Sequence, residues 1–136
     1  MKVVEIMTRD PLSVNPTETI GKVKELMADN NIRHLPVLKG RELVGIVTDR
    51  DIRAFVIRGL LESPVAHEKA LDVQVSALMT SHPISVAPDD DLREAVELLI
   101  EEKFGAVPVV DATEGLVGIV SYVDVLRCFL NQLEER

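Results

Sequence analysis

The feature that most constrains the fold is an internal repeat, in which residues 7–53 are written a second time at 79–126. The Met-Thr pair at 7–8 recurs at 79–80, and one inserted residue near 112 changes the offset from 72 to 73. A period this long, present only twice, predicts two copies of one α/β unit facing each other, because a solenoid needs at least three shorter repeats. The cleft between two such copies is the natural place for a ligand.

Length and cysteine content are consistent with a small soluble domain. A chain of 136 residues buries roughly 70% of the surface that its unfolded form exposes, so a stable core is feasible without disulfides. The single cysteine, Cys128, excludes a disulfide within the chain and has no partner at metal-ligand spacing, so we interpret it as a packed or partly exposed thiol. No signal peptide and no apolar run near 18 residues is visible, which predicts a cytoplasmic protein that does not enter the membrane.

The net charge of −8 is unevenly distributed between the two copies. Residues 1–62 hold 10 Lys and Arg against 9 Asp and Glu, whereas residues 63–136 hold 5 against 14. The acidic surface, with only three Phe and one Tyr, offers neither the basic patch nor the stacking platform that nucleic acid requires. If an anion binds, the first copy is expected to supply most of its cations.

Each copy is predicted to form a short strand, a helix, two strands and a second helix. Thr17 and Asp89 are the expected N-caps of the first helices, and the short first strand is expected at 12–14. Apolar runs at 34–38 and 43–47, and again at 106–110 and 116–120, predict two hairpins. The second helices are expected to bury these residues: Ile52, Phe55 and Val56 in the first copy, and Leu126, Phe129, Leu130 and Leu133 in the second.

The segment between the copies, from residue 59 to 74, has no clear period and is interpreted as a linker. The domain organisation is therefore a first repeat at 1–58, the linker at 59–74 and a second repeat at 75–136. The Asp89-Asp90-Asp91 run resembles a metal cluster at first sight. Acidic side chains in a first helical turn are favoured by the helix dipole, however, so we predict no metal site.

Two strand-to-helix junctions carry the residues with chemical potential. Thr48 precedes Asp51 by three positions, and Ser121 precedes Asp124 in the same way. At a helix N-terminus a hydroxyl and free N–H groups can hold a phosphate, and an ionised carboxylate accepts hydrogen bonds from a pair of ribose hydroxyls. The same pattern is also a capping box, in which both side chains satisfy their own helix. The glycine inside each preceding strand indicates a close approach by another backbone or by a ligand.

The combined pattern resembles a known family. Met-Thr-x-x-Pro-x-Ser-Val, then Leu-Pro-Val or Val-Pro-Val, then Leu-Val-Gly-Ile-Val-Thr/Ser-x-x-Asp is similar to the cystathionine-β-synthase (CBS) domain, present as a tandem pair over about residues 3–56 and 75–130. The resemblance implies an α/β (α+β) fold of two βαββα units packed as a pseudo-two-fold pair, with two clefts. In this family the clefts commonly bind AMP, ADP, ATP or S-adenosylmethionine, and the pairs often dimerise.

By position, the resemblance assigns ribose-binding carboxylates to Asp51 and Asp124, and phosphate-side hydroxyls to Thr48 and Ser121. It implies that each cleft is lined by both copies. One cleft would consist of Val4, Thr8, Arg33, His34, Ser121 and Asp124. The other would consist of Thr48, Arg50, Asp51, Val75, Thr80 and Ala106.

The two clefts are expected to be unequal. Arg33, His34 and Arg50 of the first copy have the uncharged counterparts Gly105, Ala106 and Val123 in the second. We therefore expect tighter anion binding where the cations of the first copy converge.

Three classes of function remain open at this point. The first is a regulatory module that senses an adenosine-containing ligand, needs no obligatory cofactor, forms a homodimer and signals to a regulated protein partner. The second is a structural module that dimerises or recruits a partner without a ligand. An enzyme is the third class, and the sequence contains no Ser/Cys-His-acid set, metal-ligand spacing or phosphate-binding glycine motif to support it.

Overall fold

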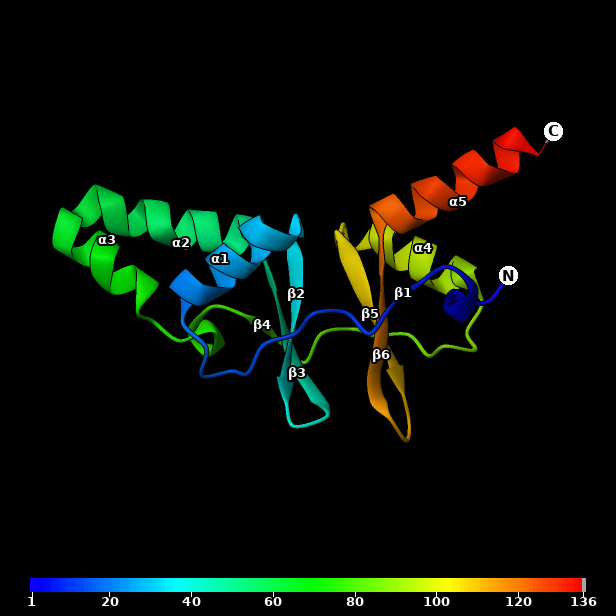
Figure 1. The fold of residues 1–136 in the computed structure, drawn as a ribbon, viewed down its shortest axis with the longest axis horizontal. Coiled ribbons are helices and arrows are strands. Elements are labelled where there is room, and N and C mark those ends of the chain that lie inside the picture. The colour runs from blue at the N-terminus through cyan, green and yellow to red at the C-terminus, as the bar shows by residue number, and fades with distance from the viewer. Residues whose placement is uncertain (136) are drawn as a thin grey trace. The chain divides into compact units, whose positions relative to one another are not determined.

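The computed structural model describes residues 1–135, which form two compact units (Figure 1). Unit 1 consists of Met1–Pro11 together with Ile84–Arg136, and unit 2 consists of Leu12–Pro83. Unit 1 is therefore discontinuous in sequence. The mixed α/β class expected from the repeat is confirmed, with a three-stranded sheet in each unit.

Unit 2 is built on a sheet with the strand order β2-β3-β4. Its elements are α1 (Ile20–Asn30), β2 (His34–Lys39), β3 (Glu42–Thr48), α2 (Asp49–Glu62), α3 (Pro64–Leu71), the 3₁₀ turn η2 (Val75–Ala77) and β4 (Thr80–Ser81). Strands β2 and β3 form the predicted hairpin, in which Gly40 has a left-handed φ of 65°. The apolar faces of α1 and α2 meet this sheet in one core, which includes Ile20, Leu35 and Ile52.

Unit 1 repeats this arrangement with the strand order β1-β6-β5. Its elements are the 3₁₀ turn η1 (Val3–Glu5), β1 (Thr8–Arg9), α4 (Leu92–Glu101), β5 (Ala106–Asp111), β6 (Gly115–Ser121) and α5 (Tyr122–Glu134). Its core includes Val3, Leu99 and Val107. In the part of the chain that is described, no helix is long and apolar enough to cross a membrane.

Each unit takes its third strand from the segment that precedes the other repeat. In unit 1, β1 pairs with β6 in antiparallel register. In the same way, β4 pairs with β3 of unit 2. The domain boundaries predicted from the sequence, at 58 and 75, follow the repeat. The compact units have different boundaries because each contains the third strand that precedes the other repeat.

The glycines inside β3 and β6 make this pairing possible. A Cβ at Gly45 would lie 2.9 Å from Met79 Cγ and 3.1 Å from the Thr80 carbonyl oxygen. At Gly118 the corresponding atoms belong to Met7 and Thr8. The predicted close approach is therefore made by the third strand and by the methionine that precedes it.

The predicted caps of the first helices are wrong by two residues in each unit. Helix α1 is capped by Thr19, whose hydroxyl accepts from the Lys22 N–H at 3.2 Å, while Thr17 lies in a turn with Asn15. Helix α4 is capped by Asp91, which accepts from the Arg93 N–H at 2.9 Å, and not by Asp89. A run of capping residue types precedes each helix, and the sequence pattern does not distinguish among them.

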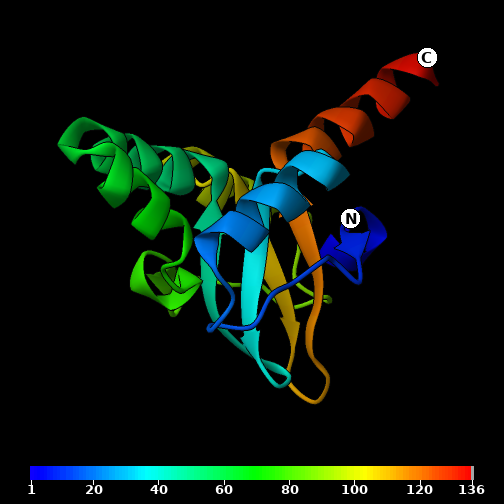
Figure 2. The same cartoon turned by 60° about the vertical axis from the view of Figure 1, so that its left-hand side comes forward.

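Residues 59–74, interpreted as a linker between the copies, are largely helical. Helix α2 continues to Glu62, Ser63 caps the next helix, and Pro64 occupies its first turn (Figure 2). Helix α3 packs against α2 at Gly59, where a Cβ would lie 3.2 Å from the Ala66 carbonyl oxygen. Because small residues make this contact, no large apolar side chains recur at helical spacing to indicate the helix.

The predicted short first strands are reduced to single bridges. Val14 bridges to Val37, and Val86 bridges to Val109, both in parallel orientation. Strands β2 and β5 lie at the edges of their sheets, as their prolines, Pro36 and Pro108, indicate.

Helix α5 departs most clearly from the expected burial. None of its described residues is buried, and Leu126, Phe129 and Leu130 are 63%, 55% and 52% exposed. In α2 the corresponding prediction is confirmed for Ile52 and Val56. The apolar stripe of α5 therefore points away from the core of unit 1.

Candidate functional site

The junction of β3 and α2 in unit 2 brings a hydroxyl and a carboxylate together. Thr48 ends the strand and caps the helix, and its Oγ1 accepts from the Asp51 N–H at 3.2 Å. Asp51 Oδ2 accepts in return from the Thr48 N–H at 3.3 Å. Both side chains thus form the capping box that the pattern allowed, and Asp51 Oδ1 accepts no hydrogen bond from the described residues.

The junction of β6 and α5 in unit 1 has the same box with additional contacts. Asp124 Oδ2 accepts from the Ser121 N–H at 2.8 Å and lies 3.1 Å from the Ser121 hydroxyl. Asp124 Oδ1 accepts from the Thr8 hydroxyl at 3.0 Å. The resemblance placed Thr8, Ser121 and Asp124 in one site, and within unit 1 these three side chains do lie together.

Basic residues occupy positions at or next to the junction of unit 2. His34 lies opposite Thr48 in the β2–β3 ladder, and the Arg33 carbonyl accepts from the Asp49 N–H at 2.9 Å. Burial lowers the pKa of His34, the charge of Arg33 lowers it further, and the charge of Asp51 opposes both. Arg50 is exposed in the first turn of α2. The hydroxyl, the carboxylate and the three basic residues thus belong to one end of one unit.

The matching positions of unit 1 are uncharged. Ala106 lies opposite Ser121 in the β5–β6 ladder, where unit 2 has His34 opposite Thr48. The Gly105 carbonyl accepts from the Tyr122 N–H, as the Arg33 carbonyl does from Asp49. Equivalent backbone positions thus carry basic residues in unit 2 and uncharged residues in unit 1, and the expected inequality of the two clefts stays a prediction.

Four further residues assigned by the resemblance have different accessibilities. Val75 is fully buried in the core of unit 2, and its N–H donates to the Glu18 carbonyl at 2.8 Å, so neither its side chain nor its amide is free for a ligand. Ala106 is buried and Val4 is half-buried. Thr80 is exposed on β4, at the ladder position equivalent to that of Thr8 on β1.

The predicted composition of the two clefts joins residues from both units. Val4, Thr8, Ser121 and Asp124 belong to unit 1, whereas Arg33 and His34 belong to unit 2. In the second set, Ala106 alone belongs to unit 1. These assignments stay predictions, and the geometry described above is that of each unit alone.

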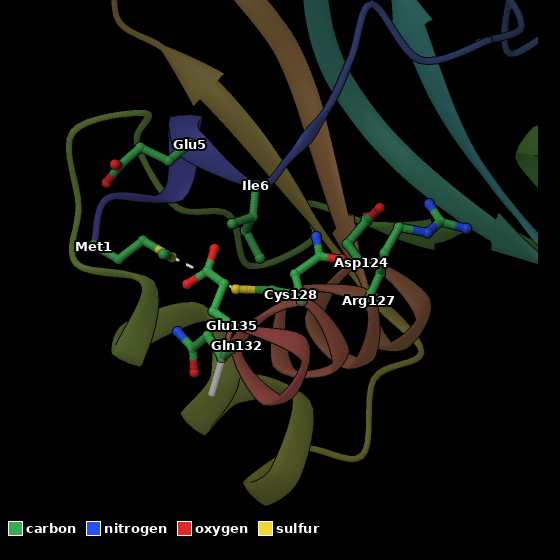
Figure 3. Close-up of a pocket in the computed structure, with 9 residues that line it drawn as sticks. Met1, Glu5, Ile6, Asp124, Arg127, Cys128, Gln132 and Glu135 are labelled. Atoms are coloured by element: carbon green, nitrogen blue, oxygen red, sulfur yellow. Dashed lines mark hydrogen bonds between the residues drawn. The ribbon is translucent and has the colours of Figure 1, made fainter.

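Unit 1 also contains a cavity that the sequence did not indicate. It has a volume of about 440 Å³ and lies between the N-terminal segment and α5 (Figure 3). The lining residues are Met1, Glu5, Ile6, Asp124, Arg127, Cys128, Asn131, Gln132 and Glu135. The Cys128 thiol lies 3.7 Å from the Met1 sulfur across this space. Among residues 1–135 no group of three or more His, Cys, Asp and Glu side chains is arranged to hold a metal ion.

Comparison with known proteins identifies the family. The family model of the CBS domain matches residues 3–58 and 75–131. The chain belongs to the CBS domain family. It carries the domain twice, as a tandem pair.

Curated relatives contain this CBS pair as part of longer chains. The chain is 35% identical over 117 residues to an inosine-5'-monophosphate dehydrogenase of Korarchaeum cryptofilum, covering 86% of this chain and 22% of the dehydrogenase. It is 30% identical over 132 residues to the uncharacterized protein MJ1225 of Methanocaldococcus jannaschii, covering 91% of this chain and 47% of that protein. The chain thus spans about a fifth to a half of the length of these relatives.

Solved CBS pairs match nearly the whole chain. The crystal structure of CBSX2 in complex with AMP superposes with a TM-score of 0.81 at 32% identity, covering 96% of each chain. A Vibrio cholerae protein described as a putative acetoin utilization protein (AcuB) gives a TM-score of 0.82 at 32% identity, covering 98% of this chain and 93% of that one. The CBS pair of protein MJ0100, crystallised with 5'-methylthioadenosine and S-adenosyl-L-methionine, gives 0.80 at 25% identity, covering 95% of this chain and 99% of that one.

Proposed function

We propose that this CBS pair is a regulatory module that binds an adenosine-containing ligand and does not itself catalyse a reaction. The observation that carries the proposal is the group of residues at the β3–α2 junction, where Thr48, Asp51 and the basic residues of unit 2 gather. The AMP complex of CBSX2, at 32% identity, supports this class of ligand.

The chemistry of the junction suits a nucleotide. Asp51 presents a carboxylate oxygen without a hydrogen bond from the described residues, which can accept from ribose hydroxyls. The first turn of α2 and the Thr48 hydroxyl suit a phosphate, and Arg50 in that turn can add a charge-assisted hydrogen bond. In unit 1 the counterpart of Arg50 is the uncharged Val123.

The proposal includes a homodimer as the means of signalling. Helix α5 exposes a continuous apolar stripe, and a second copy of the chain would remove it from water. Binding changes such an assembly only if the ligand prefers one arrangement of the subunits over another. The regulated partner would then respond to the arrangement and not to the nucleotide itself.

A thermal-shift panel tests the ligand class. The full chain is heated with AMP, ADP, ATP, NADH or S-adenosylmethionine, and a ligand at about 100 times its dissociation constant stabilises the fold by roughly 2.7 kcal/mol. We expect a shift with at least one of them. Asp51→Asn should reduce the shift, since the amide keeps an acceptor for the Thr48 N–H but loses the charge and one acceptor oxygen.

Each variant is compared with its own melting temperature without ligand, so that a change in the capping box is not mistaken for a change in binding. Arg53→Gln is the matched control, because Arg53 pairs with Asp49 on the exposed side of α2 at 3.0 Å. Absence of a shift with every ligand would contradict the proposal, as would turnover of ATP or AMP by the purified protein.

A second candidate is a structural module that dimerises without a ligand. The uncharged positions of unit 1 and the exposed stripe on α5 favour it. It predicts a dimer whose assembly and stability are unchanged by every nucleotide in the panel.

A further inference from the structure

The two carboxylates of this CBS pair differ in how fully their hydrogen-bonding capacity is used. An ionised carboxylate offers about four acceptor positions. Asp124 accepts three hydrogen bonds, from the Thr8 hydroxyl, the Ser121 N–H and the Ser121 hydroxyl. Among the described residues, Asp51 accepts one hydrogen bond, which comes from the Thr48 N–H.

The difference does not come from strand register. Thr8 lies opposite Ile119 on β6, and Thr80 lies opposite Ile46 on β3, at equivalent positions of the two ladders. Within residues 1–135 Thr80 nevertheless donates no hydrogen bond to Asp51. The charge of Asp51 instead acts on His34, for which unit 1 has Ala106.

We propose that Thr8 acts as a latch that occupies the Asp124 carboxylate and keeps this site weak until a ligand displaces the Thr8 hydroxyl. A ribose diol needs two acceptors, and Asp51 can provide both while retaining its capping bond. At Asp124 the Thr8 hydroxyl competes with the ligand for Oδ1. The Asp51 site therefore fills first.

The latch connects the N-terminal segment to ligand binding. Thr8 lies on β1, and residues 1–9 are attached to unit 1 by the β1–β6 pairing and by backbone bonds from Val3 and Val4 to the Asp90 and Pro88 carbonyls. Displacement of one exposed side chain leaves these bonds intact. The cost to the ligand is thus one hydrogen bond to a charged group, equivalent to about tenfold in affinity.

Calorimetric titration of the full chain with AMP tests the latch, which rests on the proposed nucleotide function. The wild type should bind in two unequal steps, and Asp51→Asn should abolish the tighter one. Thr8→Val is nearly isosteric and cannot donate, so it should strengthen the weaker step about tenfold and leave the tighter step unchanged.

Two variants serve as matched controls. Thr8→Ser keeps the hydroxyl and, as the conservative variant, should not show the strengthening expected of Thr8→Val. Thr113→Val removes another exposed hydroxyl-to-carboxylate bond of unit 1, that from Thr113 to Asp111 at 2.8 Å in the β5–β6 turn, and should also leave both steps unchanged. Thermal melting checks the fold of each variant, and Thr8→Ala replaces Thr8→Val if the latter does not fold.

The outcomes separate the latch from the function on which it rests. If Thr8→Val weakens the second step, Thr8 contacts the ligand and the latch is wrong. An unchanged second step, or two equal steps in the wild type, also overturns the latch while nucleotide binding stands. If no variant binds AMP and the wider panel gives no shift, the proposed function and the latch both fail.

Discussion

The polar residues at the two junctions perform a local task before any ligand is considered. Thr48 with Asp51, and Ser121 with Asp124, close capping boxes that satisfy backbone N–H groups at the starts of α2 and α5. A capping box occupies only part of a carboxylate, so the same residue can also face a ligand. Structural and binding roles therefore do not exclude each other here.

His34 gives a prediction for the pH dependence of stability. Its pKa is lowered, first by burial and then by the charge of Arg33, below the usual value of 6.5. The unfolded chain therefore takes up this proton first, so the contribution of His34 to stability is present above about pH 6.5 and is lost as the pH falls through the folded-state pKa.

Urea unfolding between about pH 7.5 and about pH 5.5 measures this contribution. We expect His34→Gln to lose stability less steeply than the wild type as the pH falls. Arg33→Gln should lie between them, because it removes one of the causes that lower the His34 pKa. A pH dependence in His34→Gln equal to that of the wild type would show that this histidine is not responsible.

Helix ends are where the sequence pattern and the structure differ in this protein. Helices α1 and α4 bury apolar residues at helical spacing, and α1 ends at Asn30, with Asn31 in the left-handed conformation (φ 52°). Their first turns are set by backbone geometry, since the capping residue must be extended and must reach the N–H groups of the first turn. Thr19 and Asp91 meet these conditions in the structure.

Alanine substitutions distinguish the two candidate caps of α1. Thr19→Ala should lower the free energy of unfolding by about 1 kcal/mol, because it leaves the Lys22 N–H without its acceptor. Thr17→Ala is the matched control, since among the described residues the Thr17 hydroxyl bonds only to Asn15 in the preceding turn, and it should cost less. Equilibrium unfolding in urea measures both, and a larger loss for Thr17→Ala would refute the assigned cap.

At the scale of the whole chain, the last helices of the two units differ in burial. Helix α2 of unit 2 buries Ile52 and Val56 and is flanked by α3, although Ile57, Leu60 and Leu61 are exposed, whereas α5 of unit 1 has its apolar stripe exposed and its opposite side along the cavity. A contiguous exposed apolar stripe is typical of an interaction surface. It supports the homodimer of the proposed function.

Charge on this stripe should prevent dimerisation. We expect the double variant Leu126→Glu and Leu130→Glu to be monomeric and folded, because substitutions at exposed positions usually change stability by no more than about 0.5 kcal/mol. Asn131 lies on the cavity side of α5, so the control variant Asn131→Glu should dimerise like the wild type. Sedimentation velocity gives the mass of each. A monomeric wild type, or a dimer that survives the double substitution, would contradict the assignment of this surface.

The sequence by itself determined the repeat, the strands and helices within it, the α/β class and the family, because apolar spacing and turn residues are local properties. It also identified the unequal charges at positions such as His34 and Ala106. Only the tertiary structure decided what depends on contacts between distant segments. The third strands come from the segments ahead of the opposite repeats, α3 packs through Gly59, and Thr8 reaches Asp124 across 116 positions. Burial is likewise a property of neighbours, which is why the apolar stripe of α5 was expected inside and is found outside.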